Sequence, residues 1–185
     1  MPVVKKQPAK PAKPATRTTR SQSAQAGPTQ KITPFLWFDD NAEEAVKFYV
    51  SVFKNSKVLS VARYGAAGPG KPGSLMTCTF QLEGQKFMAL NGGPQYHFTP
   101  ALSLFVDCAT QREVDTLWEK LLAGGGKPEA CGWLTDRFGL SWQIIPSALG
   151  RMIADKDPQR SQRVMRAMLQ MVKIDLSALE RAYRG

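Results

Sequence analysis

The sequence predicts an α+β fold with two copies of a strand–helix–strands unit, a helical C-terminal extension and a disordered N-terminal tail. Two stretches with helical periodicity each follow an apolar strand and precede an alternating hairpin. Their patterns superpose Glu44 on Glu113, Phe48 on Leu117 and Phe53 on Leu122. We interpret this match as an internal duplication.

The positive charge of the chain is concentrated near its N-terminus. Seven of the 25 Lys and Arg precede Ile32, and none of the 15 Asp and Glu do. Residues 1–30 are rich in Lys, Pro and Ala and have too few apolar groups to form a core, so we expect them to be disordered. This tail either solubilises the protein or makes weak contact with nucleic acid or another anionic surface. The nearly balanced remainder gives no reason for the folded part to bind nucleic acid.

The composition also indicates the cellular compartment in which we expect the protein. No apolar run approaches the roughly 20 residues needed to cross a bilayer, and the first residues lack the apolar segment of a secretory signal. The three cysteines Cys78, Cys108 and Cys131 are widely spaced and without a CxxC pair. We therefore expect free thiols, no disulfide or zinc site, no membrane partner and a cytoplasmic location.

The first unit is predicted over residues 32–91. A strand at Ile32–Phe38 leads through a cap at Asp39–Asn41 into a helix. Its buried face is expected to hold Ala45, Phe48, Tyr49, Val52 and Phe53. A strand at Val58–Tyr64 and a hairpin of Leu75–Leu82 and Lys86–Leu90 around Glu83-Gly84 complete the unit.

The second unit is predicted over residues 101–146. It contains a strand at Ala101–Val106, a helix at Gln111–Leu122, a short second strand and a hairpin at Cys131–Pro146. Because side chains alternate along a strand, Trp142 and Ile144 face one way, and Ser141, Gln143 and Ile145 the other. That second, partly polar face borders either solvent or a polar-lined pocket.

Together the units form a predicted domain over residues 31–146, and residues 147–185 form a helical extension. Pro146–Ile153 is expected to be a short helix, Asp157-Pro158 starts a second and Asp175 caps a third. The second helix is expected to turn one apolar face inward. That face comprises Val164, Met165, Met168, Leu169 and Met171. It forms core or a dimer interface, or else an adaptable contact surface for a partner.

The chain resembles PhnB-like proteins of the glyoxalase/bleomycin-resistance/dioxygenase (vicinal oxygen chelate) superfamily. The matching stretches are LWFDDNAEEAVKFYVSVF, FMALNGGPQYHFTPALSLFV, CGWLTDRFGLSWQIIP and RVMRAMLQMVKIDLSALERAY. This resemblance implies paired βαβββ modules that curl into a cup-shaped mixed sheet around a small-molecule pocket, often completed by a second subunit. We therefore expect a homodimer.

The resemblance also raises two cofactor questions. Relatives often carry the name 3-demethylubiquinone 3-methyltransferase, but the chain lacks a glycine-rich strand-to-helix turn with a downstream acid, so we expect no methyl-donor cofactor. Metal-dependent relatives place His, Gln or Glu at equivalent strand positions. Here these positions hold Gln143, Met88, one of Ala101, Leu102 and Ser103, and one of Ile32, Thr33 and Pro34. Because only Gln143 is a plausible ligand, we expect no metal.

The favoured function is binding or sequestration of a small molecule, with no catalytic residue assigned. The candidate binding residues are Trp37, Met88, Asn91, His97, Ser103, Trp133, Ser141 and Gln143. One alternative is a lyase, isomerase or transferase that uses a metal or His97, the only histidine, as a general base. Another is an interaction protein that uses the basic tail and the Met-rich helix.

Three further groups have structural interpretations. We expect Cys131 to be a buried thiol, since no second histidine is available as its base. Asp136 and Arg137 are expected to form an exposed pair of little energetic weight. Trp142 is expected in the core, because its parity places it opposite Gln143.

Overall fold

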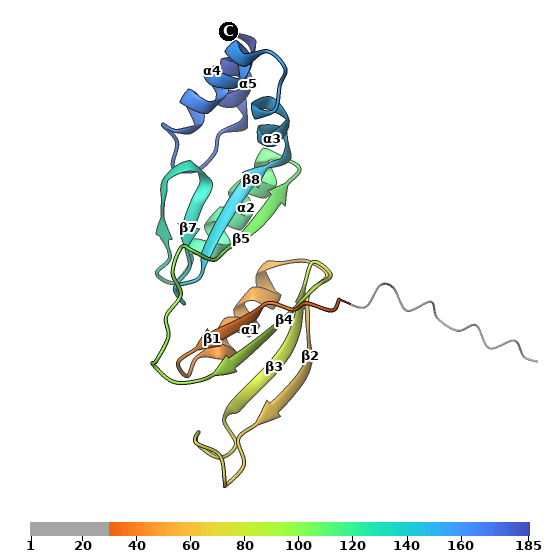
Figure 1. The fold of residues 1–185 in the computed structure, drawn as a ribbon, viewed down its shortest axis with the longest axis vertical. Helices are drawn as coiled ribbons and strands as arrows, with labels where there is room; N and C mark the ends of the chain where they lie inside the picture. Colours follow the sequence, from red (N-terminus) through yellow and green to blue (C-terminus); the bar gives the residue numbers. More distant parts are fainter. Residues whose placement is uncertain (1–29) are drawn as a thin grey trace, which may run out of the picture. The chain divides into compact units, whose positions relative to one another are not determined.

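The computed structural model describes residues 30–185. Apart from Gln30, the basic tail predicted over residues 1–30 therefore lies outside the described residues. Residues 32–185 form one unit with two sheets of four strands each. Figure 1 shows the two sheets with the helices of the extension beyond the second one.

The first module has the predicted strand–helix–strands order. It comprises β1 (Phe35–Phe38), α1 (Ala42–Val52), β2 (Lys57–Arg63), β3 (Leu75–Leu82) and β4 (Gln85–Asn91). The strand order is β1-β4-β3-β2, with β1 parallel to β4 and the other pairs antiparallel. Glu83 and Gly84 have positive φ angles of 45° and 87°. This conformation joins β3 and β4 by a two-residue turn, as the sequence predicts.

The second module repeats this order. It comprises β5 (Ser103–Cys108), α2 (Gln111–Leu122), β6 (Lys127–Pro128), a 3-10 turn (Ala130–Gly132), β7 (Trp133–Thr135) and β8 (Ser141–Pro146). The strand order β5-β8-β7-β6 matches that of the first sheet, which confirms the paired βαβββ modules. β5 begins two residues after the predicted Ala101, because Leu102 N donates to Thr99 O in a preceding turn.

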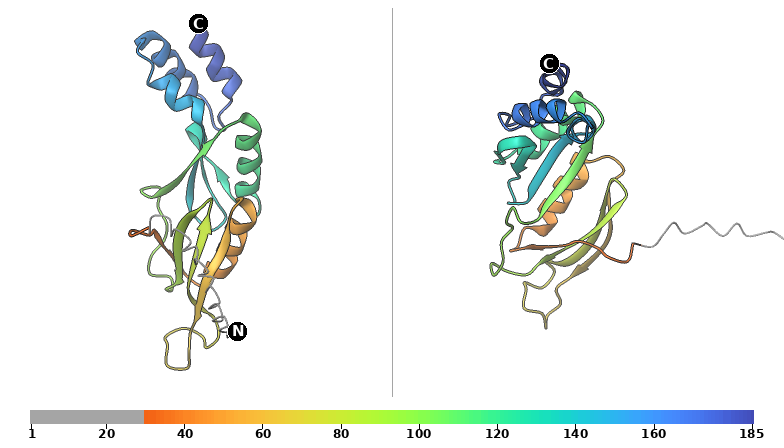
Figure 2. Two further views of the ribbon diagram at one scale, coloured as in Figure 1. Left: turned by 90° about the vertical axis from the view of Figure 1, so that its right-hand side faces the viewer. Right: turned by 45° about the horizontal axis from the view of Figure 1, so that its top comes forward.

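Both module helices lie on the same side of their sheets, as the left view of Figure 2 shows. One continuous hydrophobic core joins the inner sheet faces, α1 and α2. Trp142 of β8 is 2% exposed and stacks on Phe53 with ring centroids 5.2 Å apart. The prediction that Trp142 lies in the core is therefore confirmed.

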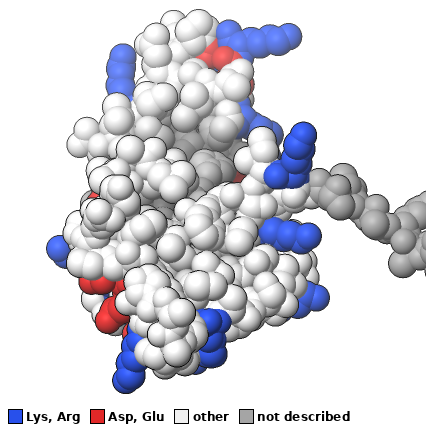
Figure 3. Space-filling view, turned by 60° about the horizontal axis from the view of Figure 1, so that its bottom comes forward, with Lys and Arg blue, Asp and Glu red and all other residues white. Residues whose placement is uncertain are grey.

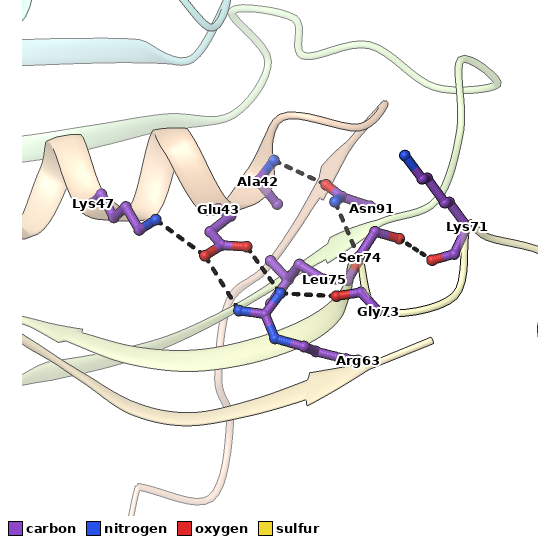
Figure 4. A network of polar contacts seen from close by, with 9 residues as sticks. All are labelled: Ala42, Glu43, Lys47, Arg63, Lys71, Gly73, Ser74, Leu75 and Asn91. Atoms are coloured by element: carbon purple, nitrogen blue, oxygen red, sulfur yellow. Dashed lines mark hydrogen bonds and ion pairs between the residues drawn. The ribbon is translucent and has the colours of Figure 1, made fainter. Parts of the chain in front are cut away.

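The start of α1 differs from the prediction. Asn41 makes no side-chain cap hydrogen bond. Instead, Asn91 Oδ1 accepts a hydrogen bond from Ala42 N at 2.8 Å (Figure 4). Because β4 pairs with β1 and places Asn91 opposite Phe38, the Asn91 side chain reaches the first turn of the helix. Asn41 therefore occupies the predicted N-cap position, but the side-chain cap expected from Asp39–Asn41 is supplied by Asn91, a residue distant in sequence.

The extension folds as three helices, α3 (Ser147–Ile153), α4 (Pro158–Met168) and α5 (Leu176–Arg184). Asp157 and Asp175 accept cap hydrogen bonds from Gln159 N and Ala178 N, as predicted. The helices surround a second core. Its buried members are Ile145, Leu149, Val164, Ile174 and Leu179.

One residue of the predicted apolar face of α4 lies outside. Leu169 is 56% exposed. As the C-cap of α4 it keeps a helical backbone, and its N donates to Met165 O at 3.0 Å, so the predicted apolar face was one residue too wide.

Candidate functional site

The face of the second sheet opposite α2, here called the outer face, carries the candidate site. The strand register places Phe105 and Trp133 on either side of Gln143. The next row along the strands holds Ser103, Ser141 and Thr135. Gln143 Nε2 donates to Ser103 Oγ at 2.8 Å, so this pair fixes the amide between two aromatic rings.

A pocket of about 370 Å³ lies over this face. Strands β5, β7 and β8 and the Cys131 turn supply one side, and helices α3 and α4 supply the other. The lining residues are Phe105, Asp107, Cys131, Trp133, Gln143, Ile145, Pro146, Ser147, Leu149, Gly150, Ile153 and Met168. A concave, mostly apolar site with few polar groups is typical of small-molecule binding.

The polar groups of the pocket are few. Gln143 makes no side-chain hydrogen bond within residues 30–185 other than that to Ser103, so its second amide hydrogen and its carbonyl oxygen can meet a ligand. Among residues 30–185, Asp107 is the only charged lining residue, and no Lys or Arg lines the pocket. Asp107 is exposed and also borders a groove on the helix side of the sheet.

The structure brings four of the eight predicted binding residues together on the outer face. Trp133 and Gln143 line the pocket, Ser103 holds Gln143, and Ser141 is buried beside them with 1% exposure. The parity predicted for β8 is confirmed, because Trp142 and Ile144 belong to the core on the opposite side.

The other four lie outside this pocket. Trp37 and Met88 belong to the first sheet, and Trp37 donates through Nε1 to Gly93 O at 2.9 Å. Asn91 caps α1. His97 is exposed in the loop between the modules and is not among the residues that line the pocket.

Sequence reasoning missed several lining residues. Phe105 could have been predicted from the sequence, because it lies two residues after Ser103 and so faces the same side of β5. Leu149, Ile153 and Met168 gave no such signal, since helical periodicity shows that they are apolar but not which pocket they reach. Cys131, predicted to be buried, is only partly so and lines the pocket.

Asp136 differs most from its prediction as half of an exposed pair. It is 3% exposed and its Oδ2 accepts hydrogen bonds from Tyr49 Oη and Trp142 Nε1, both at 2.8 Å. Its Oδ1 accepts from the backbone N of Phe138 and Leu140. Because Tyr49 belongs to α1, the carboxylate ties the two modules together.

Burial has the largest effect on the pKa values of Asp136 and Tyr49. It raises the pKa of Asp136 above its ordinary value, although the four donors act in the opposite direction. Burial also raises the pKa of Tyr49 well above its ordinary value, and the Asp136 charge adds to the effect. Arg137, the predicted partner, instead pairs with Glu44 at 3.0 Å on the surface.

A second polar network holds the first module (Figure 4). Arg63 and Lys47 both contact Glu43, at 3.1 and 3.0 Å. The hydrogen bonds to these two cations lower the pKa of Glu43 to about 2. This network lies at the start of α1, away from the pocket on the outer face, and it joins α1 to β2.

The side chains at the pocket do not suit the cofactors that the superfamily suggests. The possible ligands there are the Gln143 amide, the Ser103 and Ser147 hydroxyls, the Asp107 carboxylate and the Cys131 thiol. This set has no imidazole and one carboxylate, whereas a divalent cation needs several oxygen or imidazole donors. Among residues 30–185, no three His, Cys, Asp or Glu side chains are grouped to hold an ion. Neither strand-to-helix junction, at 39–41 or 109–110, contains the glycines that a methyl-donor nucleotide would need.

Comparison with known families places the chain. A family model described as 3-demethylubiquinone-9 3-methyltransferase matches residues 30–145, more than half of the sequence. The chain belongs to this PhnB-like family. The resemblance seen in the sequence is thereby confirmed, and the paired βαβββ modules are those expected for it.

Solved structures agree with this assignment. The PhnB protein from Bacillus cereus is 44% identical, with a TM-score of 0.57, and the match covers 62% of this chain and 97% of that one. Protein PA1353 from Pseudomonas aeruginosa is 22% identical over 62% of this chain and 95% of its own, with a TM-score of 0.51, which supports the fold alone. A comparison with curated protein sequences gives no match. Within residues 30–185, no helix has the length and apolar character needed to cross a membrane.

Proposed function

We propose that this PhnB-like protein binds a small, flat, largely apolar molecule in the pocket on the outer face. The observation that carries this proposal is the row of Phe105, Gln143 and Trp133 beneath an apolar helical wall. Trp133 and Phe105 supply ring faces for stacking. Gln143, held by Ser103, orients a polar group of the ligand, and Ser141 lies in the next row on the same face.

The charge of the residues that line the pocket limits which ligand charges it favours. Of the described side chains that line the pocket, Asp107 alone is charged, so a neutral or cationic ligand meets no repulsion from them, whereas an anion does. Because Asp107 is exposed, solvent screens this effect, and two unit charges 4 Å apart in water interact by about 1 kcal/mol. We therefore propose a modest preference against anions and no need for a metal or methyl donor.

A charge series on one ring system tests both statements. The probes are quinoline, N-methylquinolinium and quinoline-6-carboxylate at pH 8, with binding measured by calorimetry and by the rise in melting temperature. We expect quinoline and the cation to bind and the anion to bind about fivefold more weakly, by the Coulomb estimate above. The D107N variant should remove the charge preference without loss of quinoline binding.

Trp37 provides a matched control for Trp133. Both are partly exposed tryptophans on sheets, but only Trp133 lines the pocket. W133A should abolish quinoline binding and W37A should preserve it. If W37A alone abolishes binding, the ligand site lies on the first module, and the proposal is wrong.

We further propose a cytoplasmic homodimer in which a second copy covers the outer sheet faces. Supporting this are two aromatic side chains on the edge strands β1 and β5 that are at least half exposed, Phe35 (50%) and Phe105 (59%). Figure 3 shows one face with a broad uncharged area, hollowed near its middle, and charges mainly toward the edge. Free cysteines, found at all three positions, suit a reducing compartment. Phe35 lies outside the pocket, so F35E should shift sedimentation toward monomer while quinoline still binds.

A further inference from the structure

The extension supplies nearly half of the pocket. Five lining residues, Ser147, Leu149, Gly150, Ile153 and Met168, come from α3 and α4. These residues all lie beyond residue 145, where the match to the family model ends. The second module therefore forms the floor of this pocket, and the extension forms its wall.

Hydrogen bonds hold this wall against the second module. The backbone N atoms of Cys131 and Gly132 donate to Met171 O and Val172 O at 2.8 and 2.7 Å. Ile174 and Leu176 are both bonded to the Gln111 side chain of α2. Contacts to two separate elements fix the segment after α4, so Met168 has a defined position over the sheet.

The wall also packs through its own core. Leu149 lines the pocket and is 4% exposed within the second core, beside Ile145 of the sheet. Val164 and Leu179 are fully buried in the same cluster. A close-packed wall of this kind cannot expand freely around a larger ligand.

Gly150 is the exception in the wall. It lies in the middle of α3, where glycine favours the helix less than alanine does. A Cβ built on Gly150 meets no atom within 4 Å. The position therefore tolerates a side chain sterically, and glycine there leaves open space at the pocket.

We propose that the C-terminal helical extension sets the size limit of the ligand, with Met168 restricting the pocket and Gly150 leaving room at its edge. This inference rests on the proposed binding function and names the residues that determine its specificity. Ring compounds of two sizes test the size limit separately from the binding function. The floor residues contribute to the affinity for both probes, whereas the wall residues affect mainly the affinity for the larger one.

The test measures dissociation constants of quinoline and of acridine, which has one more ring, at pH 8. M168A should raise the affinity for acridine relative to quinoline about tenfold, the scale of a small volume change in an apolar pocket. G150L should lower that ratio by a similar factor. M165A is the matched control, since Met165 lies on the same helix but does not line the pocket, and it should leave the ratio unchanged.

Stability controls separate specificity from unfolding. G150A should raise the melting temperature, because alanine favours the helix, and G150L should remain folded by circular dichroism. If the wild type binds quinoline but M168A and G150L change the ratio less than twofold, the size-limit inference is wrong and the binding function stands. If the wild type binds neither probe, the proposed function fails and this inference fails with it.

Discussion

Replacing Asp136 by asparagine perturbs the hydrogen-bond cluster that joins the two modules. In the native protein the carboxylate accepts four hydrogen bonds, two at each oxygen. Asparagine keeps one oxygen and places an NH₂ group at the other site, where it meets donors. The Tyr49 hydroxyl can rotate and accept, but the Trp142 indole can only donate. At least one buried donor is therefore left without a partner in D136N.

The size of the effect follows from these contacts. An unsatisfied buried donor costs about 1–3 kcal/mol, and hydrogen bonds to a charged group contribute about 1.5–3 kcal/mol. Because the two losses overlap, we expect D136N to lower the free energy of unfolding by about 3 kcal/mol. For a domain of this size, that corresponds to roughly 6–12 °C in melting temperature.

Urea unfolding at pH 7, followed by tryptophan fluorescence, measures this change. Y49F removes only the inter-module hydrogen bond and should cost about 1.5–3 kcal/mol, and the double variant should show that the two effects are not additive. E44A is the control, because it removes the exposed Glu44–Arg137 pair between the same modules and should cost under about 1 kcal/mol. A D136N variant within about 0.5 kcal/mol of wild type would refute the reasoning, since surface substitutions already fall in that range.

Three other predictions concern the cysteines, a buried glycine and the loss of stability at low pH. Burial raises the pKa of Cys108 to about 12 and that of Cys78 above its ordinary value. Iodoacetamide at pH 8, followed by mass spectrometry, should therefore label Cys131 first. Bound quinoline should slow the labelling of Cys131. In G132A, the new Cβ would lie 2.7 Å from Ile145 and 2.9 Å from Ile174 at a φ of +83°, so the melting temperature should fall by several degrees, whereas G139A, with a similar φ but open space, should lose less. The pKa of Glu43 falls from 4.5 to about 2 on folding, so its stabilising contribution is present above pH 4.5 and lost as the pH falls toward 2. E43Q should therefore show a shallower decline in unfolding free energy over that interval than wild type, and parallel curves would contradict this.

Local patterns explain why the elements were predictable. Helix α2 has the predicted bounds Gln111–Leu122. Its apolar spacing lies within the helix, and the Thr110 cap and the following glycines lie directly beside it, so local sequence contains all three signals. The β8 alternation likewise assigned Trp142 to the core and Gln143 to the opposite face.

Errors arose where a distant residue competes with a local one. The local cap at Asp39–Asn41 gave way to Asn91, which strand pairing brings to the start of α1. Asp136 sits in a polar turn that is typical of the surface, yet Tyr49 and Trp142 converge on it from other elements. Trp142 is only six residues away in the same hairpin, but Tyr49 is 87 residues away. Because strand and helix packing alone brings Tyr49 to this turn, burial of the carboxylate was not predictable from its neighbours.

Side-chain periodicity and turn residues act over short distances, so the amino-acid sequence was enough to predict the duplicated modules and the outer face of β8. The family was predicted from the resemblance of whole stretches to known relatives. Which candidate residues meet became known from the three-dimensional fold. It placed Ser103, Trp133, Ser141 and Gln143 together on the second sheet and left Trp37, Met88, Asn91 and His97 outside that pocket. It also brought Met168 and Gly150 over the same face. A pocket is formed by packing between elements, and packing distances are not encoded in the pattern of any single element.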